Sequence, residues 1–348
     1  MKIDLLCNDG SPIGVTPMDI EGRGVGGAEL SMMTLMGVFA KRGHEVTVFN
    51  NPRIPGDHDG VRYAPLNDYN NRAPKDVVII FRSPNKRYDP SQMPKEVKKL
   101  WWSTDQFTVG NFSEMAQTVD RVITISPHHS AFFAKHYKIG RDKMTHLDLG
   151  VRTWEYEREI EKIKGRLIFC SIPDRGLPVL HAAWALIKRD APQASLVITS
   201  DYTLWGASAN NSQHRLQWAG KDDVHYVGKV PRSRLVKLQL EAEIMSYPSV
   251  YEELFCISAA ECQVAGALPV TSAAGALPTT NEFGIVIPGN PKTAMWVDSF
   301  AGRVVSLLNH EDKYMTDRQA LMRRGARTRF DWDKIASQWE EIFEESNE

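Results

Sequence analysis

Two glutamates, Glu253 and Glu261, lie in the segment Tyr247–Glu261, which runs from a predicted strand through a turn into a predicted helix. Glu253 falls in the turn and Glu261 inside the helix. The free N–H groups at a helix start can hold an anion such as a phosphate. Carboxylates accept charge-assisted hydrogen bonds from sugar and ribose hydroxyls. Spacing alone favours the simpler interpretation, in which acids near a helix start stabilise the helix. The surrounding sequence is therefore needed to choose between this role and a binding role.

A cation stands at the end of another predicted strand. The run Cys170-Ser-Ile-Pro-Asp-Arg-Gly-Leu177 follows the strand Arg166–Ser171, and ligands of open α/β sheets sit at the carboxyl ends of strands. Arg175 can pair there with a diphosphate and stabilise its charge as it leaves, with help from Ser171 and backbone groups. The alternative is an arginine at a helix start that makes a surface ion pair.

A glycine-rich loop, Gly22-Arg-Gly-Val-Gly-Gly-Ala-Glu29, precedes a predicted helix. Glycines let a loop pass close to phosphates. The string formally matches the dinucleotide fingerprint, which should follow its strand at once and be answered by an acid at the end of the next strand. Here a long stretch separates the loop from Asn8, and the next strand ends in Asn50. An NAD-dependent dehydrogenase is therefore the last of the alternatives.

Weaker signals come from the rest of the first half. Asp105, in the run Trp101-Trp-Ser-Thr-Asp-Gln-Phe107 after a predicted strand, is a candidate polar residue for an acceptor, or else a turn aspartate. The adjacent pair His128 and His129 would point in different directions on a helix, which argues against a shared metal ion.

Short apolar runs and helical patterns alternate along the chain and must position these residues. Such alternation predicts parallel sheets covered on both faces. In the first half the expected strands are Lys2–Asn8, Glu45–Asn50, Val77–Phe81, Leu100–Ser103 and Arg121–Ile125, with a helix at Gly27–Gly43. In the second half the expected strands are Arg166–Ser171, Leu196–Thr199, His225–Val227, Ile244–Tyr247, Leu268–Thr271 and Gly284–Ile287. The expected helices of this half are Leu177–Lys188, Arg232–Glu241, Ile257–Ala265, Lys292–Asn309 and Asp317–Arg327.

The length of 348 residues predicts two domains. The seam falls in the charged segment Trp154–Lys164, so we expect a first domain over residues 1–158 and a second over 159–330. A last helix in 331–348 is amphipathic, and the sequence leaves open whether it packs on the second domain or crosses back to the first.

Bulk composition excludes several classes of protein. The net charge of −1 lacks the basic excess of a dedicated nucleic-acid binder. The four cysteines form no C-x-x-C pair, which predicts neither a disulfide framework nor a zinc site and favours a reducing, cytoplasmic location. Asp4 interrupts the start of the chain where a signal peptide would be apolar. No apolar run is long enough to span a membrane.

The segment Tyr247–Glu261 resembles the E-x7-E signature of retaining glycosyltransferases of family 4, and the resemblance extends through Ala242–Ser249 and Ala265–Thr271. Gly26-Gly27-Ala-Glu29 is similar to the Gly-Gly-x-Glu loop of the same family. The resemblance implies the GT-B fold, in which two Rossmann-like domains face a central cleft. The second domain would bind the donor and the first the acceptor.

The same resemblance implies roles for single residues. Glu253 would contact the donor sugar, Glu261 the nucleotide ribose and Arg175 the diphosphate. The family usually has glycines beside the aromatic residue of the turn, whereas Leu254 and Cys256 flank Phe255 here. The expected catalytic residues are Glu253, Arg175 and Asp105. The expected donor-binding residues are Gly26, Gly27, Ser171, Lys229, Val230, Phe255, Cys256, Ile257, Glu261, Thr279 and Thr280.

The expected function is transfer of a hexose from a nucleotide-diphosphate sugar, with UDP-glucose as the first candidate, to an acceptor hydroxyl with retention of configuration. No cofactor or metal is expected. The acceptor (a glycan, lipid, small molecule or modified DNA base) and the oligomeric state stay open. One alternative is a glycosyltransferase for phage DNA bases, which Trp101, Trp102 and Phe107 would bind by stacking. Another is a non-catalytic protein that binds nucleotide sugars.

Overall fold

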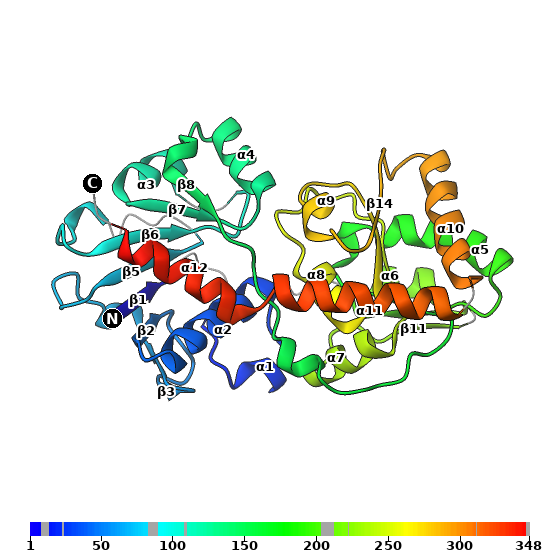
Figure 1. Ribbon diagram of the computed structural model, residues 1–348, viewed down its shortest axis with the longest axis horizontal. Helices are drawn as coiled ribbons and strands as arrows, with labels where there is room; N and C mark the ends of the chain where they lie inside the picture. Colours follow the sequence, from blue (N-terminus) through cyan, green and yellow to red (C-terminus); the bar gives the residue numbers. More distant parts are fainter. Residues whose placement is uncertain are drawn as a thin grey trace. The chain divides into compact units, whose positions relative to one another are not determined.

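The computed structural model describes residues 1–7, 14–22, 24–82, 90–107, 110–202, 212–221, 223–310 and 312–345, so Asn8 lies outside the described residues. The chain forms two compact units (Figure 1). The first unit comprises Met1–Ile20, Val25–Gly150 and Trp332–Glu348, and the second comprises Glu21–Gly24 and Val151–Asp331. The long stretch of the first unit thus ends at Gly150 rather than at residue 158, and the last helix belongs to this unit.

The first unit is built on a sheet with the strand order β3-β4-β2-β1-β5-β6-β7-β8. Every pairing is parallel except that of β3 with β4. Its central strand β5 has the sequence VVIIF and is buried along its whole length, as expected for a parallel sheet covered on both faces. The strands are β1 Lys2–Leu6, β2 Glu45–Phe49, β3 Gly56–His58, β4 Val61–Ala64, β5 Val77–Phe81, β6 Lys98–Trp102, β7 Arg121–Thr124 and β8 Met144–His146.

The last helix of the chain completes the core of the first unit. Its apolar face packs on α2, where the ring centroid of Phe343 lies 5.3 Å from that of Phe39. Trp339 meets Trp102 of the sheet at 5.2 Å. The helices are α1 Asp19–Gly22, α2 Gly27–Lys41, α3 Phe112–Thr118, α4 Pro127–His136 and α12 Trp332–Glu344.

The tryptophans that sequence analysis offered for base stacking are core residues. Trp101 is 0% exposed and Trp102 1% exposed, so neither ring presents a face to a nucleic-acid base. Their strand, β6, is buried on both faces of the sheet, which the run of large apolar residues could not distinguish from a binding surface. Phe107 is 68% exposed.

The second unit has a fully parallel sheet with the order β11-β10-β9-β12-β13-β14. Strands β10 and β11 are added in order on one side of β9, and strands β13 and β14 are added in order on the other side of β12. The carboxyl ends of β9 and β12 therefore form a topological switch point, where open α/β sheets bind ligands. The strands are β9 Arg166–Phe169, β10 Ser195–Ile198, β11 Val224–Tyr226, β12 Ile244–Tyr247, β13 Leu268–Ser272 and β14 Ile285–Ile287.

Helices cover both faces of this second sheet (Figure 1). Helix α10 packs on α5, and α11 packs on α8. Thr279 and Thr280 belong to the short helix α9. The helices are α5 Leu177–Asp190, α6 Ser212–Trp218, α7 Arg232–Glu241, α8 Ile257–Ala265, α9 Leu277–Thr280, α10 Ala294–Leu308 and α11 Asp312–Arg329, with 3-10 turns η5 Thr153–Tyr156 and η6 Pro173–Arg175. Among all residues that the structure describes, every helix is too short or too polar to cross a membrane.

Candidate active site

A buried carboxylate lies at the switch point of the second sheet. Glu253 follows strand β12 and is 3% exposed. Its Oε1 accepts a hydrogen bond of 2.5 Å from the hydroxyl of Tyr247, the last residue of the strand. Arg175 donates from Nη1 to Oε1 at 3.2 Å and to Oε2 at 3.0 Å. A buried charge is stable only when it is paired and hydrogen-bonded, and this carboxylate is both.

The charge partner of Glu253 comes from the segment after β9, as the sequence predicts for Arg175. The guanidinium of Arg175 stacks over the ring of Tyr251 at 4.3 Å. The hydroxyl of Ser171 lies 3.2 Å from that of Tyr247. The structure thus brings three predicted residues together and adds two tyrosines that sequence reasoning did not single out. Their signal was their place in the strand and turn that lead to Glu253.

The protonation states of this cluster follow from its burial and its charges. Burial works against the cation of Arg175, but Glu253, Tyr247, Tyr251 and Cys256 together hold the pKa of Arg175 above its ordinary value. Burial, reinforced by Glu253, raises the pKa of the Tyr247 hydroxyl well above its usual range. At neutral pH the cluster therefore contains a permanent cation and a permanently protonated hydroxyl donor.

Two glycines allow the loops that carry these residues to approach each other. Gly176 has φ 133°, and a Cβ there would lie 2.4 Å from the carbonyl oxygen of Pro248. Gly275 has φ 61°, and a Cβ there would lie 2.2 Å from the carbonyl oxygen of Glu253. Ala276 then donates its N–H to that same oxygen at 2.7 Å. The backbone on both sides of the carboxylate is therefore fixed by contacts that only glycine permits.

The start of helix α8 completes this part of the second unit. Cys256 precedes the helix with φ 75°, and within the described residues its side chain makes no capping hydrogen bond. The helix begins at Ile257, so first-turn N–H groups point away from the helix and can meet an anion. Phe255 is buried and packs edge-on against Phe330, with 5.9 Å between ring centroids. The aromatic residue of the turn thus anchors the loop in the core.

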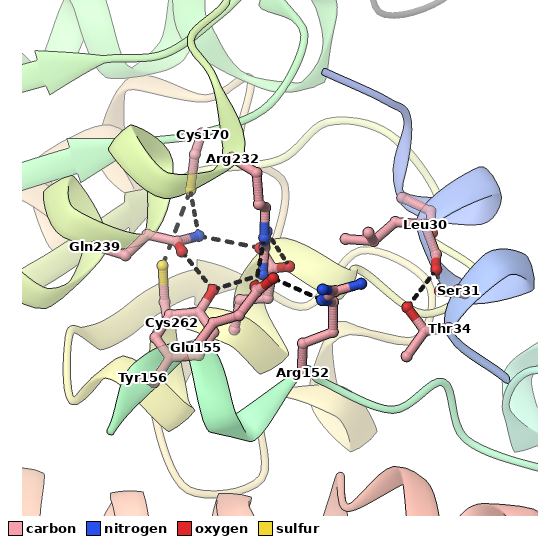
Figure 2. A network of polar contacts seen from close by, with 12 residues as sticks. Leu30, Ser31, Thr34, Arg152, Glu155, Tyr156, Cys170, Arg232, Gln239 and Cys262 are labelled. Atoms are coloured by element: carbon pink, nitrogen blue, oxygen red, sulfur yellow. Dashed lines mark hydrogen bonds and ion pairs between the residues drawn. The ribbon is translucent and has the colours of Figure 1, made fainter. Parts of the chain in front are cut away.

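The second glutamate, Glu261, lies deeper on α8 and is also 3% exposed. Arg232 donates to its Oε1 at 2.6 Å, and the amide of Gln239 donates to its Oε2 at 3.1 Å. Figure 2 shows these two side chains in one network with Glu155 and Tyr156. Sequence reasoning missed Arg232 and Gln239, because a polar side chain on an amphipathic helix is usually exposed.

The remaining predicted residues of the second unit are more scattered. Lys229 and Val230 are half-buried in the loop between β11 and α7. Thr279 is exposed and donates its hydroxyl to the carbonyl of Ala276 at 2.9 Å. Thr280 is 1% exposed, and its hydroxyl has no hydrogen-bond partner within the described residues.

The predicted residues of the first unit lie at the carboxyl edge of its sheet. Gly26 precedes helix α2 and Gly27 begins it. Asp105 follows strand β6 and accepts from Arg82 Nε at 2.7 Å. Arg82, which follows β5 with the unusual φ of 68°, also donates to Glu29 at 2.8 Å. Asp105 is therefore held by an arginine that sequence reasoning did not identify.

Possible metal ligands and the four cysteines were the remaining candidates for a site. Over the described ranges, no group of three or more His, Cys, Asp or Glu side chains is arranged to hold a metal ion. The four cysteines are free thiols. The Sγ atoms of Cys170 and Cys262 lie 3.9 Å apart beside Gln239 (Figure 2).

Comparison with known proteins identifies the kind of domain that carries this site. Residues 165–310, which include Arg175, Glu253 and Glu261, match the family described as glycosyl transferases group 1. No curated protein matches the sequence.

Solved structures share the fold of the whole chain. Sucrose-phosphate synthase from Thermosynechococcus elongatus is 16% identical, with a TM-score of 0.71 over 99% of this chain and 98% of that one. AviGT4, a glycosyltransferase involved in avilamycin A biosynthesis, is 18% identical, with a TM-score of 0.71 over 99% and 97%. HepE of Anabaena, solved with UDP-glucose, is 16% identical, with a TM-score of 0.67 over 98% of each chain. The chain has the two-domain α/β GT-B fold, and the match of residues 165–310 to a glycosyltransferase family supports a transferase enzyme.

Proposed function

We propose that the chain transfers a hexose from a nucleotide-diphosphate sugar to an acceptor hydroxyl, with retention of the anomeric configuration. The observation that carries the proposal is the cluster of Glu253, Arg175 and Tyr247 at the switch point of the second sheet, beside the start of α8. The cluster combines a cation, a carboxylate and free helix N–H groups, which are the groups that a sugar diphosphate needs. Retention rests on the resemblance to family 4.

The chemical step divides the work between these groups. The bond between the anomeric carbon and the diphosphate oxygen breaks, and negative charge grows on the leaving diphosphate. Arg175 and the N–H groups at the start of α8 stabilise that charge. Glu253 would hold hydroxyls of the donor sugar, since an ionised carboxylate has about four lone-pair sites and Arg175 and Tyr247 leave part of them available. The acceptor oxygen then forms the new bond to the anomeric carbon, and its proton passes to the departing diphosphate.

The donor we propose first is UDP-glucose. HepE, which shares the fold, was solved with that molecule. No divalent metal is required by this proposal, because Arg175 and the helix supply the positive charge. The four free thiols fit the reducing cytoplasm that we propose as its location.

A panel of nucleotide sugars tests the proposal. At equal concentration, a donor that binds more tightly should raise the melting temperature further, and UDP-glucose should give the largest rise. The matched donor is then incubated with candidate glycan, lipid, small-molecule and DNA acceptors, and the anomeric proton of the product is followed by NMR. An inverted anomeric centre would reject the family 4 mechanism, and binding without transfer or hydrolysis would favour a non-catalytic binding protein.

A further inference from the structure

The carboxylate of Glu261 is held by two side chains of a single helix. Arg232 and Gln239 both lie on α7, and each donates to a different oxygen of Glu261, at 2.6 Å and 3.1 Å. Both donors are buried, Arg232 being 6% exposed and Gln239 0% exposed. The plane of the carboxylate is therefore set by α7, although Glu261 itself belongs to α8.

The two donors are held in turn by the 3-10 turn η5. Glu155 accepts from Arg232 Nε at 2.7 Å, and the hydroxyl of Tyr156 accepts from Arg232 Nη2 at 3.1 Å. Tyr156 then donates to Gln239 Oε1 at 2.7 Å. These contacts close a ring of four side chains, Arg232, Tyr156, Gln239 and Glu261, so that no member can rotate without breaking a buried hydrogen bond (Figure 2).

The charges of the network alternate and balance. Arg152 pairs with Glu155 at 2.6 Å, Glu155 with Arg232 at 2.7 Å, and Arg232 with Glu261 at 2.6 Å. Burial works against the charge of Arg232, but Glu261, Tyr156 and Glu155 together hold its pKa well above the ordinary value. Glu261, although almost fully buried, therefore faces a permanent cation.

A carboxylate whose orientation is fixed is a prepared receptor for hydroxyl groups. An ionised carboxylate offers about four lone-pair sites, and the contacts described above use one on each oxygen. Freezing a receptor group before binding removes the entropy that its ordering would cost the complex. We infer that Arg232 and Gln239 are positioning residues, which orient Glu261 toward the hydroxyls of the donor's ribose. This inference rests on the proposed function and on the ribose role that the resemblance to family 4 implies for Glu261.

The test compares nucleotides with and without ribose hydroxyls. UDP and GDP are each titrated against their 2′,3′-dideoxy analogues by calorimetry, in the full chain and in Arg232→Met. The wild type should bind the ribonucleotide of the preferred base at least about tenfold more tightly, because a site built for hydroxyls discriminates against analogues that lack them. In Arg232→Met this ratio should fall to near one, while affinity for the dideoxy analogue stays within about twofold.

Two further variants keep the test decisive. Arg234→Met makes the same change at an exposed position of α7 and should retain the wild-type ratio. Gln239→Met removes one hydrogen bond to Glu261 without leaving a charge unpaired, so it covers the case in which Arg232→Met does not fold. Its ratio should lie between those of the wild type and Arg232→Met.

The possible failures are distinguishable. A wild type that binds both members of each pair equally well would refute the proposed ribose role of Glu261, and the inference with it. A wild type that discriminates, together with folded Arg232→Met or Gln239→Met variants that discriminate equally well, would overturn the inference alone. A lower melting temperature with an unchanged ratio has the same meaning, because it would show that the network only stabilises the fold.

Discussion

At the scale of single residues, Glu253 and Arg175 depend on each other. Glu253 is 3% exposed and has Arg175 as its charge partner. Removing one member of such a pair leaves the other buried without compensation, which costs about 3–5 kcal/mol. A variant at either position is therefore expected to lose stability as well as any role in catalysis, because Glu253→Gln keeps the shape of the side chain but leaves Arg175 without its carboxylate.

We predict that Glu253→Gln and Arg175→Ala each lower kcat/KM at least about tenfold, which corresponds to about 1.4 kcal/mol of transition-state stabilisation. The measurement is steady-state transfer from the donor found in the nucleotide-sugar panel. Glu252→Gln, the same change at the exposed neighbouring position, should retain wild-type rates. Near-normal activity in both site variants would remove the site assignment.

The sequence predicted which residue types form the site better than it predicted their backbone conformation and burial. The expectation of glycine beside Phe255 has a physical reason, since Cys256 adopts φ 75°, a left-handed conformation that glycine takes without steric cost. A cysteine there costs about 1–2 kcal/mol, and no sequence pattern indicates that a non-glycine residue will accept it. Arg232 escaped prediction for a related reason, because its burial depends on partners from η5 and α8 that only the folded chain brings near.

At the scale of elements, runs of apolar residues predicted the central strands but not the short strands near the edges of the first sheet. Strand β5, with its five consecutive apolar residues, was readily found. The hairpin β3–β4 and the edge strand β8 were missed. Edge strands are short, partly polar and paired on one side only, so their sequences carry little periodicity. The switch point between β9 and β12 depends on strand order, which the alternation of strands and helices leaves undetermined.

Helix α4 contains a buried histidine that makes a pH-dependent contribution to stability. His129 is 0% exposed. Burial, and to a lesser degree the neighbouring His128, lower its pKa from 6.5 to about 3. Between those two values the unfolded chain binds a proton that the folded chain refuses, so stability falls as the pH is lowered through this window.

We predict that His129→Asn flattens this acid slope. The asparagine oxygen can replace Nδ1 as the acceptor for the N–H of Ile125 without titrating. Between pH 6.5 and pH 4.5, the loss of unfolding free energy should be smaller in the variant by about 2 kcal/mol. Urea unfolding at the two pH values measures it, and His136→Asn on the exposed face of the same helix serves as the control. Equal slopes in His129→Asn and the wild type would contradict the assigned pKa.

At the scale of the whole molecule, the sequence predicted two α/β domains but not which of them owns the last helix. The apolar face of an amphipathic helix must pack against another element, but the sequence of the helix does not show which element that is. The structure pairs α12 with α2, through Phe343 on Phe39 and the ion pair of Glu340 with Arg42 at 2.6 Å. The assignment was beyond sequence reasoning because these contacts join residues far apart in the chain.

Deleting residues 332–348 should therefore destabilise the first unit and spare the second. The deletion removes the buried side chains of Trp339 and Phe343, and each large apolar side chain contributes about 1.5–3 kcal/mol. We expect calorimetry to show a lost or strongly lowered transition for the first unit. The transition of the second unit, identified by its response to added nucleotide, should persist. A chain that ends at residue 345 is the control, and an unchanged first transition in the deletion would refute the role of α12.

The split composition of the first unit also bears on how the polypeptide comes off the ribosome. Its sheet is translated before the long stretch of the second unit, but the helix that closes its core is translated after every residue of the second unit. During synthesis the second unit can finish folding while Phe39 and Trp102 still lack their aromatic partners from α12. The unit whose translation begins first is thus completed second, and a nascent chain that stalls before α12 presents chaperones with one finished unit and one open core.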